Sequence, residues 1–260
     1  MAQTTVLITG ATRGLGKALA ERFLALPNHT VIAANRQPEG ATSKALIDLP
    51  KGENSALIII GYDAKAEQSA FDVAREIREV HGIEHLDIVV PNAAIATQFT
   101  LARDVQRAAI LEHVEVNVLS VVSLFQATRD LLQKSSRPVF APIGSRAGSL
   151  GRQPPVPNSA YGASKSMVFW YGVRINAEED WLNTFVIDPA WVQTDMGNTA
   201  ARNLGFKEAT FSVDEVTDGV VQVLRTATKE KHGGRAVLYT ELAYGYNADN
   251  ESLSSAGFCN

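Results

Sequence analysis

The sequence predicts a doubly wound α/β fold, with one seven-stranded, mostly parallel sheet and helices on both of its faces. Short apolar runs alternate with longer amphipathic segments, an order typical of a parallel sheet with crossover helices. The short runs are almost continuously apolar and rich in β-branched residues, as strands buried on both faces are. The chain has 260 residues, 45% of them hydrophobic, and α/β folds of this length often form one domain. We therefore expect a single domain over 1–260.

Each expected strand is an apolar run, and the amphipathic segments between the strands are the expected helices. The helix within 103–134 contains a break, and its part at 118–132 is apolar around most of its circumference, which favours burial against the sheet. The strands are expected at 4–10, 29–36, 56–63, 86–94, 138–145, 181–190 and 235–240, and the helices at 15–26, 65–80, 103–134, 159–179 and 213–230.

Two stretches fit neither a strand nor a helix. The first, 146–158, is rich in glycine and proline, and the second covers 191–212. Both follow the ends of expected strands. Ligands of open α/β sheets bind outside the carboxyl ends of the strands, so we expect these stretches to line a pocket, with 191–212 as a lid region. The alternative is two ordinary surface loops.

Composition narrows the class of protein. The net charge is −4 and no block of lysine and arginine occurs, which argues against a nucleic acid or an anionic membrane as partner. The longest apolar runs, such as "ALIIIG", are too short to span a bilayer. No signal segment precedes the first strand, and Cys259 is the one cysteine, so no intrachain disulfide can form. We expect a soluble, cytoplasmic protein.

The histidines do not suggest a metal centre. His81 and His85 lie four residues apart, but Gly82 between them favours a loop, and no acid or third histidine completes a site. We expect no bound metal, and we expect His29 and His113 on the surface.

A glycine-rich turn follows the first strand. Gly10, Gly14 and Gly16 lie between a strand and a helix, where glycine lets a diphosphate approach the backbone N–H groups at the helix start. The spacing is G-x-x-x-G-x-G rather than the commonest dinucleotide pattern, G-x-G-x-x-G. The alternative is a tight turn without a ligand.

The end of the second strand indicates which dinucleotide. An acidic residue there would hold the ribose hydroxyls and repel a 2′-phosphate, but the strand ends in Asn35 and Arg36. Arg13, in the glycine-rich turn, is expected close by. Two guanidinium groups suit a phosphate, so the sequence favours NADP(H). The alternative is two solvated surface arginines.

With these residues in place, the chain resembles the short-chain dehydrogenase/reductase family over essentially its whole length. Its motifs occur in the family's order, and within the family "WVQTDMGN" is similar to carbonyl reductases that include fungal polyketide ketoreductases. The resemblance implies a Rossmann-type fold. The motifs are "TGATRGLG" from Thr9, Asp63, "NAA" from Asn92, Asn117, Ser145, Tyr161 with Lys165, and "DPAWVQTDM" from Asp188.

Four residues are the expected catalytic set. Tyr161 can donate a proton, and Lys165, one helical turn along, would lower the pKa of that phenol together with an oxidised nicotinamide. Ser145 can donate a hydrogen bond to the substrate oxygen. The resemblance implies that Asn117 holds a water on the route to the lysine. Taken singly, each has an ordinary alternative: a buried aromatic, a solvated helix charge, a turn serine and a helix asparagine.

The resemblance also implies the cofactor contacts. Asp63 would bind the adenine amino group, Asn92 would steady the sheet, and Thr194 and Val192 would meet the nicotinamide side. Pro91 stands where the family usually has asparagine, and Ala94 and Ala190 stand where it usually has glycine. These differences leave the fine geometry of the cofactor and substrate site open. The expected NADP(H)-binding residues are Gly10, Thr12, Arg13, Gly14, Leu15, Gly16, Asn35, Arg36, Asp63, Asn92, Ala93, Tyr161, Lys165, Pro189, Val192 and Thr194.

These observations predict an NADPH-dependent oxidoreductase that reduces a ketone or aldehyde to an alcohol, with Tyr161 as general acid. Trp191, Met196, Phe206 and Phe211 offer apolar area to an aromatic or polyketide-derived ketone, and part of 95–101 and Pro154, Pro155 and Pro157 would complete the pocket wall. The helix at 118–132 suggests a homodimer or homotetramer, as in the family. Two alternatives stay open: an NADP(H)-binding regulator, and a non-redox enzyme such as a cyclase on the same fold.

Overall fold

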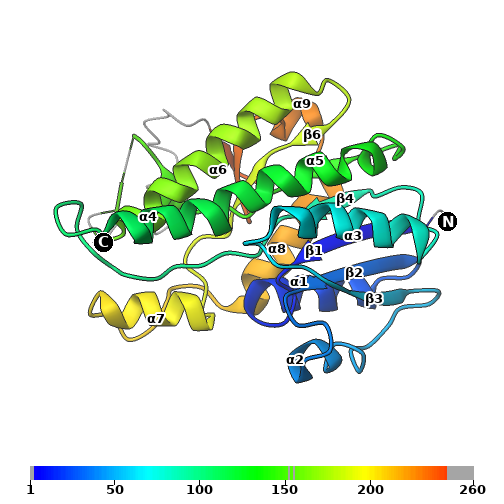
Figure 1. Ribbon diagram of the computed structural model, residues 1–260, viewed down its shortest axis with the longest axis horizontal. Coiled ribbons are helices and arrows are strands. Elements are labelled where there is room, and N and C mark those ends of the chain that lie inside the picture. Colours follow the sequence, from blue (N-terminus) through cyan, green and yellow to red (C-terminus); the bar gives the residue numbers. More distant parts are fainter. Residues whose placement is uncertain (1–2, 152, 155, 245–260) are drawn as a thin grey trace.

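The computed structural model describes residues 3–151, 153–154 and 156–244 (Figure 1). Pro155 and Cys259, on which two sequence expectations rest, lie outside these residues. Helices cover both faces of a central sheet, as the alternation of apolar and amphipathic segments predicts. The strands are β1 (Thr4–Thr9), β2 (His29–Asn35), β3 (Ala56–Gly61), β4 (Ile88–Val90), β5 (Val139–Phe140), β6 (Asn183–Thr184), β7 (Val186–Asp188), β8 (Ala236–Leu238) and β9 (Ala243–Tyr244).

The first six strands form a parallel sheet in the order β3-β2-β1-β4-β5-β6. The chain leaves β1 toward one edge and returns to β4 on the other side of β1. The carboxyl ends of β1 and β4 therefore lie at the point where the strand order reverses, which is where open α/β sheets bind ligands.

The expected single sheet of seven strands is divided in the structure. The run predicted at 181–190 forms β6 and β7, and β7 belongs to a second sheet, β7-β8-β9, in which β9 is antiparallel. Proline explains the division. Asn183 N–H donates to Pro138 O and Ile187 N–H donates to Pro142 O. In this register the N–H of residue 142 would donate to the Phe185 carbonyl oxygen. Pro142 has no N–H, so this hydrogen bond cannot form. A parallel bridge between Ile143 and Ile187 then joins the two sheets.

Alternate residues of β1 serve two apolar cores. Val6 and Ile8 pack with α1 (Gly14–Ala25) and α8 (Val213–Thr226), whereas Leu7 packs with α3 (Glu67–Glu79) and α5 (Ser120–Leu132) on the opposite face. Each core holds apolar side chains with no exposed area, and this burial is the dominant stabilising contribution. Figure 1 shows α3, α5 and α6 (Ser159–Glu178) side by side on this second face.

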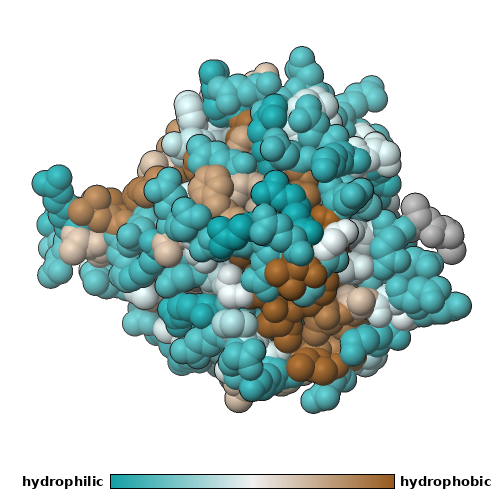
Figure 2. All heavy atoms as spheres, turned by 45° about the vertical axis from the view of Figure 1, so that its right-hand side comes forward, coloured by the Kyte–Doolittle hydropathy of each residue, from teal (hydrophilic) through white to brown (hydrophobic). Residues whose placement is uncertain are grey.

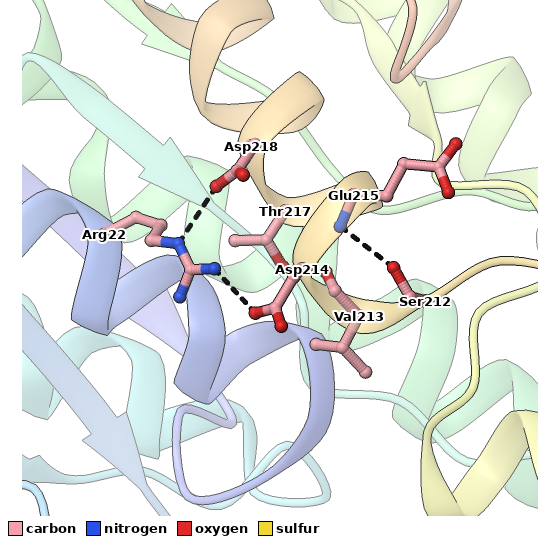
Figure 3. Close-up of polar contacts among 7 residues, drawn as sticks. All are labelled: Arg22, Ser212, Val213, Asp214, Glu215, Thr217 and Asp218. Carbon is pink, nitrogen blue, oxygen red and sulfur yellow. Dashed lines mark hydrogen bonds and ion pairs between the residues drawn. The ribbon is translucent and has the colours of Figure 1, made fainter.

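On the first face, α1 and α8 are also joined by charge (Figure 3). The Arg22 guanidinium contacts Asp214 at 2.6 Å and Asp218 at 3.0 Å. The Ser212 hydroxyl begins α8 by accepting the N–H of Glu215 at 3.2 Å. This cap satisfies one of the free N–H groups of the first helical turn.

The break expected within 103–134 is a π-helical turn. The helix is continuous from Arg107 to Leu132 and consists of α4 (Arg107–Val114), the π turn Glu115–Leu119, and α5. This helix is long and apolar enough, by length and composition, to cross a membrane. The sequence expectation considered uninterrupted apolar runs, which are shorter than this helix. In this fold the helix packs against α3, α6 and the sheet, as core helices do.

One helix escaped sequence analysis because it is short. The stretch expected to be irregular at 191–212 contains α7 (Asp195–Asn203), in which Ala201 is the buried residue. Its nine residues are fewer than the window of about 11 to 18 residues in which apolar periodicity is recognised. Its start is fixed by Thr194, whose hydroxyl accepts the Gly197 N–H at 3.1 Å. The other short elements are α2 (Ala41–Lys44), α9 (Lys229–His232) and the 3₁₀ turn Arg146–Gly148.

The surface seen in Figure 2 is hydrophilic over most of its area, with two separate apolar areas. Such a surface is ordinary for a folded domain, since apolar atoms always contribute part of the accessible area.

Candidate active site

A cavity of about 980 Å³ lies at the carboxyl ends of the parallel strands. Its size falls within the range of ligand pockets in proteins, roughly 300–1,000 Å³. The cavity is lined by residues that follow β1, β2, β3, β4, β5 and β7, so segments far apart in the sequence meet there. Of the expected catalytic and cofactor-binding residues, Asn117 alone does not line it.

The glycine-rich turn forms one end of the cavity, and its backbone requires glycine. Gly10 and Gly14 have φ of +68° and +54°, in the left-handed region that other residues avoid. A Cβ on Gly16 would lie 2.4 Å from the Gly10 carbonyl oxygen. Arg13 precedes α1 and offers it no side-chain cap. The first-turn N–H groups of α1 are therefore available to an anion.

Asn35 lies directly beside this turn. Its side chain is 1% exposed, and Oδ1 accepts the Ala11 N–H at 2.8 Å. Among the described residues, its Nδ2 has no hydrogen-bond partner although it is buried. Because a buried N–H without a partner is costly, and Asn35 lines the cavity, Nδ2 is a donor suited to a polar ligand.

Two arginines line the same end of the cavity. Arg13 and Arg36 are both exposed. Arg13 contacts Asp195 at 3.8 Å, but both side chains are about four-fifths exposed (76% and 80%), so this ion pair is weak. Both guanidinium groups are thus available to a phosphate at this end.

Asn92 ties the end of β1 to the end of β4. Its Nδ2 donates to the carbonyl oxygens of Thr9, at 2.9 Å, and Gly10, at 3.2 Å. The Thr9 hydroxyl accepts the N–H groups of Asn92 and Ala93, each at 3.0 Å. Asp63 follows β3, and its Oδ1 accepts the Lys65 N–H at 3.0 Å. Asp63 is one of the residues that line the cavity.

Tyr161, Ser145 and Lys165 meet in the middle of the cavity. Tyr161 lies in the first turn of α6 and is hydrogen-bonded to the Ser145 side chain. The Ser145 hydroxyl also accepts the Ala147 N–H at 3.2 Å. Lys165 is 3% exposed, and its ammonium donates to the Ile143 carbonyl oxygen at 2.7 Å. The ammonium lies 5.7 Å from the centre of the Tyr161 ring.

The electrostatics of this trio differ from the expectation in one respect. Burial raises the pKa of Tyr161 to about 12, and the Asp188 carboxylate raises it further, against a lowering by the Ser145 hydrogen bond. Burial lowers the pKa of Lys165 to about 8. In this state burial and Asp188 outweigh the lowering by Ser145, and the Lys165 ammonium donates its hydrogen bond to Ile143 O. A lowered tyrosine pKa therefore needs a further positive charge in the cavity.

Asn117 has a different place from the other site residues. It is 1% exposed in the π turn, and its side chain accepts the Ile95 N–H at 2.8 Å and donates to Ile95 O at 3.0 Å. It also donates to the Ser164 hydroxyl at 3.0 Å, and that hydroxyl donates to Tyr161 O at 2.7 Å. π turns are frequent at functional sites. Here the π turn connects the loop after β4 with the helix that carries Tyr161.

Sequence analysis assigned no role in the site to three residues of this region. His113 was expected on the surface, but it has no exposed area. It is buried because it accepts the N–H of Thr97, and no neighbouring residue in the sequence indicates this contact. Asp188 is 1% exposed and accepts the Ala190 N–H at 3.0 Å. Ser164 is buried. Its position between Tyr161 and Lys165 is the sequence feature that could have indicated a role in the site.

The opposite end of the cavity is apolar. Trp191 and Phe206 contact edge to face, with ring centroids 5.5 Å apart and an interplanar angle of 84°. Phe206 lines the cavity and is 53% exposed. Pro157 does not line the cavity, in contrast to the expectation. Apolar residues that line the cavity include Ile95, Phe99, Pro154, Val156, Trp191, Met196, Leu204, Phe206 and Phe211.

Ala190 occupies a strained position at the site. Its φ is +61°, which is unfavourable for a residue with a Cβ. The sequence showed alanine where the resembling family has glycine, and the backbone explains why glycine suits that place. Among the described residues, no group of three or more histidine, cysteine, aspartate or glutamate side chains could hold a metal ion.

Comparison with known proteins finds relatives over most of the chain. A family model described as short chain dehydrogenase matches residues 4–205. Norsolorinic acid ketoreductase nor1 of Dothistroma septosporum is 39% identical over 244 residues, which cover 92% of this chain and 91% of that protein. The norsolorinic acid ketoreductase of Aspergillus parasiticus is 38% identical over 243 residues, which cover 92% and 89%.

Two solved structures share the fold. The NADPH-bound carbonyl reductase from chicken fatty liver has a TM-score of 0.81 at 23% identity and covers 95% of this chain and 100% of that chain. The carbonyl reductase Sniffer of D. melanogaster has a TM-score of 0.82 at 22% identity and covers 94% and 100%.

Proposed function

The chain belongs to the short-chain dehydrogenase family, and we propose that it is an NADPH-dependent reductase that converts a ketone or aldehyde to an alcohol. The resemblance seen in the sequence and the α/β fold class are thereby confirmed. The observation that carries the proposal is the meeting of Tyr161, Ser145 and Lys165 in the cavity at the strand ends. A proton donor, a hydrogen-bond donor and an ammonium together suit a carbonyl oxygen that becomes an alcohol.

The residues present fit NADP(H). The backbone at Gly10, Gly14 and Gly16 leaves the close approach that a diphosphate needs, and the buried Nδ2 of Asn35 has no partner among the described residues. Arg13 and Arg36 would hold the 2′-phosphate. Asp63 would hold the adenine, and Thr194, Val192 and Pro189 would lie on the nicotinamide side. The NADPH-bound reductase of similar fold supports this assignment.

Within this site, each side chain has a defined task. The bound cofactor supplies hydride to the carbonyl carbon. Tyr161 Oη gives its proton to the carbonyl oxygen, and the Ser145 hydroxyl donates a hydrogen bond to that oxygen as charge develops on it. The phenolate left on Tyr161 would be stabilised by two positive charges together, that of the oxidised nicotinamide and that of the Lys165 ammonium, which is charged below a pH of about 8. Such a general acid contributes about a hundredfold or more to the rate.

The substrate is proposed to be an aromatic or polyketide-derived ketone. Trp191, Phe206 and Phe99 line the apolar end of the cavity and can pack against a flat ring. The two norsolorinic acid ketoreductases, at 39% and 38% identity, support a substrate of this class. Neither a regulator without turnover nor a cyclase is favoured, because neither needs a proton donor beside a nicotinamide site.

The proposal extends to assembly and location. Apolar side chains on the outer surface of α4 to α6 would join two copies into a homodimer, or a homotetramer through a further surface. Light scattering of the purified protein measures this state directly. The cytoplasmic location, and the lack of a nucleic-acid or membrane partner, stay predictions of the sequence. The apolar side chains concerned are Leu111, Leu119, Met167, Trp170 and Val173.

The experiment that tests the function is a carbonyl panel. We expect the protein, incubated with NADPH and a set of aromatic and aliphatic ketones and aldehydes, to oxidise NADPH and form the alcohols, with higher kcat/KM for aromatic ketones. NADPH binding without oxidation on any carbonyl would favour a regulator. A product formed without cofactor would favour the non-redox enzyme.

A further inference from the structure

His113 is a buried histidine that the proposed reaction does not use. It lies in the last turn of α4 and has no exposed area, yet it is not among the cavity-lining residues. A buried imidazole needs partners for both of its nitrogens. Those partners connect it to the active site.

The hydrogen bonds of His113 fix its tautomer. The Thr97 N–H lies 3.2 Å from Nε2 and can only donate, so Nε2 is the acceptor. Nδ1 lies 2.8 Å from the Ala109 carbonyl oxygen and therefore carries the proton. His113 is thus a neutral imidazole with both nitrogens engaged, and one bond leaves its own helix for the loop after β4.

Asn117, four residues along, holds the same loop. Its amide makes two hydrogen bonds to the Ile95 backbone, at 2.8 and 3.0 Å, whereas His113 holds the Thr97 N–H. Two anchors on one helix thus fix alternate residues of the loop. In the same loop, Ile95, Ala96 and Phe99 line the cavity. The two anchors therefore set the position of this part of the substrate wall.

His113 also contacts the proposed proton donor. Its ring lies edge-on to Tyr161, with centroids 6.5 Å apart and an interplanar angle of 74°. This lies within the range of favourable aromatic pairs. One side chain therefore contacts both the substrate wall and Tyr161.

We propose that His113 is a positioning residue for substrate binding: its Nε2 holds the Thr97 N–H and so sets the loop 95–99 against Tyr161. The expected effect on KM rests on the proposed reductase function. The expected effect on the position of the loop rests on the hydrogen bonds alone.

Two variants separate its roles. His113→Phe keeps a ring beside Tyr161 but removes the acceptor for Thr97, whereas the side-chain oxygen of His113→Gln can accept that N–H. We expect His113→Phe to speed hydrogen exchange of the Thr97 amide about tenfold and to raise KM for the ketone about tenfold. The Kd for NADPH and kcat should stay within about threefold of the wild type. His113→Gln should restore both the exchange rate and KM.

The matched control is His232→Phe. His232 is also buried, at 6% exposure, and accepts a backbone N–H, that of Thr228 at 3.1 Å, but it does not line the cavity. This variant should lower thermal stability and leave KM and the exchange of Thr97 unchanged. If His113→Phe behaves in the same way, or if His113→Gln rescues neither measurement, the proposed role is overturned. The exchange measurement needs no ketone, so it decides the loop contact even if no carbonyl is reduced.

Discussion

The ammonium of Lys165 is held by the Ile143 carbonyl oxygen at 2.7 Å, at the end of the strand beside Tyr161. Lys165 is therefore positioned by the sheet rather than by the tyrosine, and it is buried with a pKa lowered from 10.5 to about 8.

This burial predicts a pH-dependent stability. Between pH 8 and 10.5 the folded protein has released a proton from Lys165 that the unfolded chain still holds, so stability rises with pH across this window. Lys165→Met removes the contribution. The free energy of unfolding of the wild type, minus that of the variant, should increase from pH 7.5 to 9.5 in chemical denaturation. A difference that stays level or decreases would contradict the lowered pKa.

The backbone of Ala190 predicts that glycine at this position stabilises the fold. Its φ of +61° costs an alanine more than a glycine, so Ala190→Gly should raise the free energy of unfolding by about 1 kcal/mol. The control is Ala177→Gly, at an exposed helical position of α6, which should lower it by about 0.5–1 kcal/mol. The strain at Ala190 is absent if both variants lose stability.

Arg36 predicts the choice of cofactor. Arg36→Asp removes one of the two guanidinium groups at the cavity end and adds a repelling charge. A charge-assisted hydrogen bond is worth about 1.5–3 kcal/mol, so NADPH affinity should fall about tenfold or more while NADH affinity changes little. Arg75→Asp, on the exposed surface of α3, is the control. An unchanged affinity ratio would place the 2′-phosphate elsewhere.

The ion pairs of Arg22 should stabilise the contact between α1 and α8, and this stabilisation should weaken as the salt concentration rises. Arg22 contacts two carboxylates, those of Asp214 and Asp218, and is itself 28% exposed (Figure 3). Arg22→Met should lower the free energy of unfolding by up to about 1 kcal/mol, and less so in 1 M salt, where screening is strong. Arg174→Met breaks a single exposed pair with Glu178 and should cost about 0.3–0.5 kcal/mol. Equal losses in both variants would show that the paired contact adds nothing.

Local sequence patterns predicted the strands of the six-stranded sheet and the meeting of Tyr161 and Lys165 at the cavity, for physical reasons. Buried parallel strands leave apolar runs, and the spacing of Tyr161 and Lys165 places both on one helix face. The split between β6 and β7 depends on Pro142, which follows β5 and lies outside the run 181–190. The helix α7 was missed because its nine residues are too few for apolar periodicity to be recognised.

The remaining differences concern long-range partners. Thr97 gives His113 its partner, and Ile143 takes the Lys165 ammonium, 16 and 22 residues away along the chain. Hydrogen bonds of this kind form only when loops and strands meet in the fold. Residue type therefore indicated which side chains could do chemistry, whereas their protonation and orientation required the structure.

The central claim is that Tyr161 delivers the proton to the carbonyl oxygen, and Tyr161→Phe tests it most directly. We predict that this variant binds NADPH with unchanged affinity and reduces an aromatic ketone at least about a hundredfold more slowly, whereas Tyr171→Phe in the same helix keeps wild-type rates. A Tyr161→Phe enzyme with near-normal kcat would contradict the account.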